Sequence, residues 1–204
     1  MAIKNVVFDM GGVLLAKAER KDVENALSFK EDTDVVFSKL FHSPARAELD
    51  RGVITEKQAF DLIYAEIPER SREDAKTFYD YYMCHRKTND GMVELLKTLK
   101  ENGYTLYVLS NFYTDMKAYI KMNGYDFIDD FKEIFNSSEH KLIKPDKEVY
   151  EKFLSLYDLD ASECFFTDDK EINVRSAIEC GFNGATFTDC NSLVASMREM
   201  GIKI

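Results

Sequence analysis

The sequence predicts an α/β fold: a doubly wound parallel sheet with helices on both faces and an all-helical segment inserted after the first strand. Three observations lead to this prediction. Short apolar runs alternate with helix-patterned segments from residue 89 onward. A charged, helix-patterned block separates the first apolar run from the others. Polar residues follow three of the apolar runs directly, as at the carboxyl edge of a parallel sheet.

The first strand is predicted over Val6–Phe8, a short apolar run that ends at a carboxylate, Asp9. Gly11 and Gly12 follow almost at once. Glycine adopts positive φ at little steric cost and lets a ligand approach the backbone. We therefore expect Asp9 at the carboxyl end of a strand, with backbone N–H groups free to face an anion. Taken alone, this stretch is equally compatible with a strand that simply ends in a turn.

Residues 17–86 carry few strand signals and are predicted to form a helical cap. Apolar residues recur at helical spacing over 22–29 and 34–41. Thr55 and Gln58 have the spacing of a capping box ahead of another such pattern. After the break at Pro68, Ser71 is expected to open a further helix.

The remainder of the chain alternates between the two patterns. Asn89 is expected to cap a helix that stops at Gly103. Further helices are predicted near 115–122, 147–157, 173–180 and 192–200, and strands over 104–109, 131–135, 164–166 and 185–187. The predicted catalytic core thus comprises residues 1–16 and 87–204, and the cap comprises residues 17–86.

Composition narrows the classes of partner. The formal net charge of -10 argues against a nucleic-acid partner bound through phosphate neutralisation. No apolar stretch approaches membrane-spanning length, so no membrane partner is expected. The four cysteines form no C-x-x-C pair, and most are expected to be buried as small hydrophobic residues. A cytoplasmic location is the default expectation, and the protein is expected to be a monomer or a homodimer.

Three predicted strands end in polar groups that should meet at one edge of the sheet. Asp9 follows the first, Ser110-Asn111 the second, and Asp168-Asp169 follow the apolar run from Cys164. Ligands of open parallel α/β sheets bind at this edge. Lys144 lies in a loop before a predicted helix and is expected to reach the same place.

These residue types fit phosphoryl transfer. Two carboxylates, Asp9 and Asp169, are typical Mg²⁺ ligands, and Mg²⁺ commonly takes one or two carboxylates together with substrate phosphate. Carboxylates also act as nucleophiles through aspartyl-phosphate intermediates. Lys144 would neutralise negative charge at the site, and Ser110 and Asn111 would donate hydrogen bonds to phosphoryl oxygens.

Four segments resemble the four sequence motifs of the haloacid dehalogenase superfamily: residues 8–14 (Phe-Asp-Met-Gly-Gly-Val-Leu), 109–111 (Leu-Ser-Asn), 144–146 (Lys-Pro-Asp) and 166–173 (Phe-Thr-Asp-Asp-x-x-x-Asn). The resemblance spans the whole chain and implies a Rossmann-like core with a helical cap that closes over the substrate. It implies that Asp9 is the nucleophile, Ser110 the phosphate-binding hydroxyl and Lys144 the charge-neutralising base.

The resemblance further implies that Mg²⁺ is held by Asp9, Asp169 and the backbone carbonyl of Gly11, with Asp168 alongside. Asn111, Gly11 and Gly12 are candidates for binding substrate phosphate. Asn173 either orients Asp169 or has a structural role.

The chain departs from the family pattern at Gly11, where phosphatases of this superfamily usually carry a second aspartate as general acid and base. Such catalysis is typically worth about 10²–10⁴-fold. Three interpretations stay open. In the first, the leaving group departs with little help, as from a sugar 1-phosphate. We favour this interpretation because the sequence is similar to a branch of sugar-phosphate phosphatases that also lack the second aspartate. Alternatively the cap supplies the acid, for which the candidates are His42, Glu48, Asp50 and His85, or the chain is a catalytically weak binding or regulatory protein.

The main enzymatic rival is a 2-haloacid dehalogenase, because those enzymes also lack the second aspartate. Their fourth motif tends to carry Ser-Asn where this chain has Asp168-Asp169. Paired carboxylates facing Asp9 would repel it unless a cation lies between them. The sequence therefore favours a Mg²⁺-dependent phosphatase that hydrolyses a small phosphorylated metabolite, such as a sugar phosphate, through an aspartyl-phosphate on Asp9.

Overall fold

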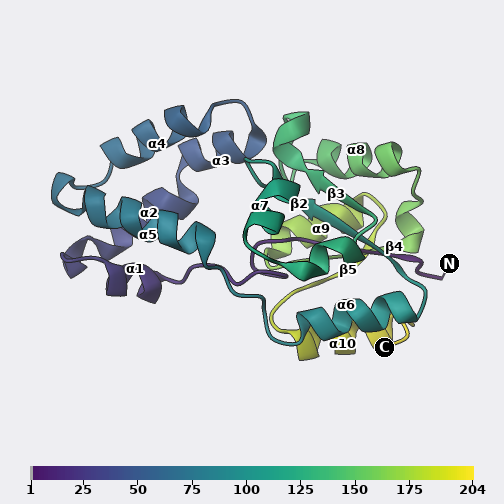
Figure 1. The fold of residues 1–204 in the computed structure, drawn as a ribbon. Coiled ribbons are helices and arrows are strands. Elements are labelled where there is room, and N and C mark those ends of the chain that lie inside the picture. The colour runs from purple at the N-terminus through teal and green to yellow at the C-terminus, as the bar shows by residue number, and fades with distance from the viewer. Residues whose placement is uncertain (1) are drawn as a thin grey trace.

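The computed structural model describes residues 2–204 and contains one five-stranded parallel sheet beside a block of helices (Figure 1). The strands are β1 (Asn5–Phe8), β2 (Thr105–Ser110), β3 (Glu133–Asn136), β4 (Cys164–Asp168) and β5 (Asn183–Thr186), in the spatial order β3-β2-β1-β4-β5. β1 is the central strand. β2 and β3 follow on one side of it, and the chain then crosses over and places β4 and β5 on the other side. The predicted doubly wound α/β fold is confirmed.

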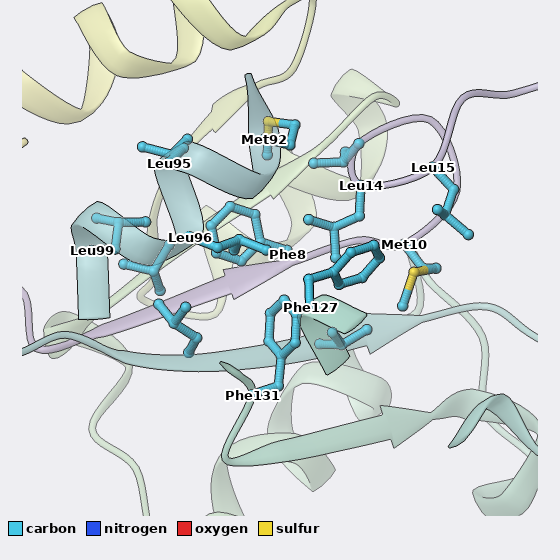
Figure 2. Packing of buried hydrophobic residues seen from close by; sticks show 14 of the residues in the cluster. Phe8, Met10, Leu14, Leu15, Met92, Leu95, Leu96, Leu99, Phe127 and Phe131 are labelled. Carbon is cyan, nitrogen blue, oxygen red and sulfur yellow. The ribbon is translucent and has the colours of Figure 1, made fainter. Parts of the chain in front are cut away.

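Both faces of the sheet are covered by helices, so both faces of each central strand are buried. The core helices are α6 (Met92–Glu101), α7 (Met116–Met122), α8 (Lys147–Tyr157), α9 (Glu171–Glu179) and α10 (Cys190–Glu199). Along β1, Val6 and Phe8 join the hydrophobic cluster that includes residues of α6, α7 and α10, whereas Val7 joins the cluster that includes residues of α8 and α9. Figure 2 shows Phe8 packed among Leu96, Phe127 and Phe131 in the first cluster. Burial on both faces explains the continuous apolar runs that predicted these strands.

The inserted block consists of α1 (Arg20–Ala26), α2 (Thr33–His42), α3 (Pro44–Arg51), α4 (Glu56–Ala65) and α5 (Arg72–Cys84). These helices lie to one side of the sheet (Figure 1) and pack around a hydrophobic cluster of their own, drawn from residues 18–83. This arrangement is what a helical cap requires, and the boundaries at 16/17 and 86/87 stay a prediction.

Local sequence signals account for ends of α3 and α4. The capping box between Thr55 and Gln58 is present at the start of α4, as predicted. The sequence analysis missed α3, although its signals are standard: Ser43 accepts a hydrogen bond from the Arg46 N–H, Pro44 opens the helix, and Gly52 ends it at φ 77°.

Two sequence expectations were wrong. Asn89 does not cap α6, whose N-cap is Gly91; its amide instead donates to the carbonyls of Gly12 and Val13 and ties the loop after β1 to the second linker. Of the four cysteines, which are all free, only Cys164 is fully buried. Over residues 2–204, no helix combines the length and apolar character that crossing a membrane would need.

The two linkers between core and cap run side by side. The N–H of Ala16 donates to the carbonyl of Lys87 at 2.8 Å, and Leu15 and Thr88 form an antiparallel bridge. The cap is therefore attached to the core through a paired hinge directly beyond the strand that ends at Asp9.

The end of α3 forms a second contact between cap and core. The Ser137 hydroxyl donates to the carbonyl of Asp50 at 3.0 Å, and Arg51 pairs with Asp146 at 2.8 Å. Gly52 lies so close to the core that an added Cβ would come within 2.3 Å of the Ser138 carbonyl oxygen. Glycine is required here by backbone conformation and by space.

Gly52→Ala is expected to destabilise the protein by about 2–4 kcal/mol, because the left-handed backbone penalty adds to a backbone clash. Gly103→Ala is the matched control, since Gly103 also has positive φ, at 85°, but an added Cβ there meets no atom within 4 Å. Urea unfolding of both variants measures the difference. Equal destabilisation would contradict the close docking of α3 on the core.

Candidate active site

The ammonium of Lys144 lies at the centre of the polar groups that gather at the carboxyl edge of the sheet. Its Nζ is 2.6 Å from Asp168 Oδ2 and 2.9 Å from Asp9 Oδ1, and it donates to the carbonyl of Leu109 at 2.9 Å. The Lys144 side chain is only 1% exposed. Burial disfavours its charge, but the carboxylates of Asp168 and Asp9 outweigh burial and raise the pKa of Lys144.

Asp9 occupies the predicted position directly after β1. Its N–H donates to the carbonyl of Thr167 on β4 at 2.9 Å, and this hydrogen bond ties Asp9 to the neighbouring strand. Burial raises the pKa of Asp9 to about 6; Lys144 opposes the shift, while Asp168 and Asp169 add to it. Asp9 is thus a buried carboxylate with one ammonium partner and an oxygen left over for chemistry.

Asp168 is fully buried and its two oxygens accept several hydrogen bonds. Asn173 donates to both of them, at 3.0 and 2.9 Å, and the Lys170 N–H donates to Oδ1 at 2.9 Å. Together with Lys144, these donors saturate the carboxylate. Asp168 therefore anchors Lys144, and Asn173 orients Asp168 instead of Asp169.

Asp169 faces the loop after β1 and pairs with Lys17, whose Nζ lies 2.7 Å from Oδ2. The Lys17 side chain is 64% exposed, so this ion pair is weak and easily exchanged. Gly12, at φ 92°, makes the approach possible, because an added Cβ would lie 2.6 Å from the Asp169 Cγ. The N–H of Gly12 already donates to the Leu15 carbonyl, so the expectation that it faces an anion was wrong.

Ser110 and Asn111 end β2 beside Lys144. Ser110 is buried and lines the cavity described below. The Asn111 side chain is used differently from the expectation: its Oδ1 accepts from the Lys144 N–H at 2.9 Å and its Nδ2 donates to the Lys144 carbonyl at 3.1 Å. Its amide positions the backbone of Lys144, which leaves only the main chain of Asn111 for an anion.

A cavity of about 610 Å³ opens above these groups, between core and cap. Asp9, Gly11, Ser110, Lys144 and Asp169 line its core side. The cap contributes mainly aromatic and cationic side chains: Phe37, Phe41, His42, Arg46, Tyr79 and Tyr82. Most of the predicted site residues therefore line one cavity together with the cap, as a substrate pocket requires, whereas Gly12 and Asp168 are not among its lining residues.

Two of the four cap residues considered as proton donors line the cavity, and the other two do not. His42 and Asp50 line it, whereas Glu48 and His85 are not among the lining residues. Burial, together with Lys170 and Lys17, lowers the pKa of His42. Burial raises the pKa of Asp50 although Arg46, 3.1 Å away, opposes the shift.

Besides Arg46 of α3, three cations of the cavity wall, Lys17, Arg86 and Lys170, were missed by the sequence analysis. Lys17 and Arg86 belong to the linkers and Lys170 lies at the start of α9. No local sequence pattern identifies these three residues, because they reach the cavity only through the paired course of the linkers and the turn after β4.

Oxygen atoms of Asp9, Asp168 and Asp169 lie within 4.8 Å of one another, close enough to surround a hard cation. The fit is best at Asp169, whose partner is the exposed ammonium of Lys17, and poorest at Asp168, which is saturated by its own donors. The donor set therefore suits Mg²⁺. The sequence argument that the paired carboxylates need a cation between them and Asp9 is weakened, because Lys144 already lies between Asp9 and Asp168. Their repulsion alone therefore does not require a metal.

A family model described as haloacid dehalogenase-like hydrolase matches residues 3–181 of the chain. Flavin mononucleotide hydrolase 1 from Arabidopsis thaliana is 28% identical over 160 residues, which are 77% of this chain and 58% of that protein. Bifunctional epoxide hydrolase 2 from Rattus norvegicus is 22% identical over 98% of this chain and 39% of its own length. The chain thus spans less than two thirds of either relative.

Among solved structures, an enzyme of the same family from Bacteroides thetaiotaomicron, in complex with magnesium and inorganic phosphate, is similar with a TM-score of 0.72. It is 26% identical, and the alignment covers 93% of this chain and 96% of that one. An L-2-haloacid dehalogenase is similar at a TM-score of 0.66 and 17% identity, with 90% and 86% coverage, which shows a shared fold.

In the metal-free protein, Asp9 is expected to titrate with a pKa of about 6. An unfolded aspartate releases its proton near pH 3.9. Between these values the native state binds more protons, so this group's contribution to stability declines as pH rises. Carboxyl ¹³C NMR, assigned with Asp9→Asn, measures the titration. A pKa at or below about 4 would contradict the burial argument.

Gly12→Ala is expected to cost about 2–4 kcal/mol of stability and to displace the Asp169 carboxylate. Gly11→Ala is the matched control, because its Cβ would meet only side-chain atoms of Arg86, the nearest at 3.2 Å, and no backbone atom. Urea unfolding reports the stability of both variants, and calorimetric Mn²⁺ titration reports the state of the acidic cluster. Tolerance of alanine at residue 12 would contradict the close contact with Asp169.

Proposed function

The chain belongs to the haloacid dehalogenase-like hydrolases, and from that premise we propose that it is a Mg²⁺-dependent phosphatase acting on small phosphorylated metabolites. The observation that carries the proposal is the pairing of Asp9 with a fully buried Lys144, 2.9 Å apart, at the floor of the cavity between core and cap. A carboxylate held in this way is a positioned nucleophile.

In the proposed reaction, an oxygen of Asp9 attacks phosphorus and the bond from phosphorus to the ester oxygen breaks. Lys144 supports ionised Asp9 and offsets the added charge of the phosphoryl group. Ser110, at the end of β2, is placed to donate to a phosphoryl oxygen. Water then attacks phosphorus, which releases inorganic phosphate and restores Asp9.

Asp9, Asp169 and the carbonyl of Gly11 would hold the metal. Mg²⁺ at this position supplies neutralisation of phosphoryl charge, which lets one anion approach another. Lys17 would give up its place at Asp169, an inexpensive exchange because the Lys17 side chain is 64% exposed. Asp168 would contribute through Lys144, since its oxygens are already occupied.

The relatives support this choice of reaction class. One is a flavin mononucleotide hydrolase, and the Bacteroides thetaiotaomicron enzyme is described with magnesium and inorganic phosphate. Dehalogenases also share the fold, so chloride release is the rival outcome of any test. Because Gly11 provides no proton donor, sugar 1-phosphates, whose leaving groups need less help, are the first substrates to try.

Wild-type protein is expected to release phosphate from a panel of sugar phosphates and from flavin mononucleotide, and excess EDTA should abolish the release. Asp9→Asn should reduce turnover by at least about 10⁴-fold, in the range reported for loss of a catalytic nucleophile. Asp61→Asn is the matched control, because Asp61 is an exposed aspartate of α4 paired only with Lys57.

Circular dichroism verifies that both variants keep the fold. Phosphate release that persists in Asp9→Asn would contradict the mechanism. Metal-independent chloride release from 2-chloropropionate, without phosphate release, would replace the reaction class with dehalogenation. Silence in both assays would favour a binding or regulatory protein.

A further inference from the structure

We propose that Arg86 is a further catalytic residue, which stabilises the oxygen of the leaving group as its bond to phosphorus breaks. The inference rests on the proposed phosphatase function. It explains how the reaction proceeds although the residue two positions after the nucleophile has no side chain.

The guanidinium of Arg86 occupies the space that a side chain at residue 11 would fill. A Cβ added to Gly11 would lie 3.2 Å from Arg86 Nη2, 3.8 Å from Nη1 and 4.0 Å from Cζ. Arg86 and Gly11 line the same cavity as Asp9. The absence of a side chain at Gly11 thus makes room for a cation in the cavity that Asp9 also lines.

Arg86 is held in place by the linkers. Its Nε donates to the Ala16 carbonyl at 3.1 Å and its Nη2 to the Leu15 carbonyl at 3.3 Å. The guanidinium lies over the Tyr82 ring, 5.2 Å from its centroid, and the Tyr125 hydroxyl donates to the Arg86 carbonyl at 2.6 Å. These contacts fix the guanidinium but engage only neutral groups.

The charge of Arg86 is not neutralised by the protein. Within residues 2–204, no carboxylate lies within ion-pair distance of Arg86, whereas Lys17, Arg46 and Lys144 each have a carboxylate partner. Its Nη1 makes no hydrogen bond to that part of the chain, so donors remain for a ligand. A half-buried, positioned and uncompensated cation is what a developing oxyanion requires.

Arginine keeps its protons at any physiological pH, so Arg86 cannot replace a general acid. The bond from phosphorus to the ester oxygen breaks with its electron pair on that oxygen. Arg86 donates a hydrogen bond to the oxygen as charge develops, and the oxygen then takes a proton from water. The structural alternative is that Arg86 only joins the linkers through the two carbonyls.

The test compares Arg86→Gln, Arg86→Lys and wild type on substituted phenyl phosphates, which keep one shape while the leaving group changes in acidity. For Arg86→Gln we expect kcat/KM to fall about 10²-fold for phenyl phosphate, whose leaving oxygen is basic. With 2,4-dinitrophenyl phosphate, which needs no help, the expected loss is under about 3-fold. Arg86→Lys should recover part of the loss, because it restores the charge.

Arg198→Gln, an exposed arginine of α10 that bonds the Ile204 carbonyl, is the matched control and should behave as wild type. Thermal unfolding separates folding defects from catalytic ones. Equal loss across the series, or no loss, would overturn the proposal, since neither depends on the leaving oxygen. If wild type releases phosphate neither from this series nor from the sugar phosphates and flavin mononucleotide, the proposed function itself fails.

Discussion

The buried ammonium of Lys144 is the interaction on which the rest of the site depends. It joins Asp9 from β1, Asp168 from β4 and the end of β2 through one charged group. Buried charges are costly unless they are paired and fully hydrogen-bonded, and loss of one partner typically costs about 3–5 kcal/mol. The hydrogen bonds from Asn173 and from the backbone of Lys170 to Asp168 complete this requirement. Asp9 is thereby held by groups from the carboxyl ends of β1, β2 and β4.

The linkers make the same region responsive to the cap. They pair with each other next to Asp9 and carry Lys17 and Arg86 into the cavity. Lys17 contacts Asp169, and Arg86 contacts the space above Gly11. A movement of the cap about this hinge would change the charges that surround the reacting groups. In the proposed function, the cap side of the cavity, which is mainly aromatic and cationic, would select among phosphorylated compounds according to what lies beyond the phosphate.

Much of this arrangement follows from the sequence, and the exceptions have physical causes. Asp9, Ser110, Lys144 and Asp169 could be predicted because strand ends in a parallel sheet share one edge whatever the loops do. Hydrogen bonds made within loops could not be predicted. The N–H of Gly12 and the side-chain amide of Asn111 bind neighbouring groups whose positions depend on the three-dimensional path of the backbone. Arg86 lies 70 residues from the carbonyl of Ala16 that it binds, so no local pattern could identify it.

The central claim is that Asp9 itself carries the phosphoryl group during turnover. Rapid acid quench of the working enzyme, followed by borohydride reduction, converts an aspartyl phosphate to homoserine, which peptide mass spectrometry locates in the sequence. We expect homoserine at residue 9, formed only when substrate is present. Turnover with an unmodified Asp9, or with the modification at another carboxylate, would contradict it.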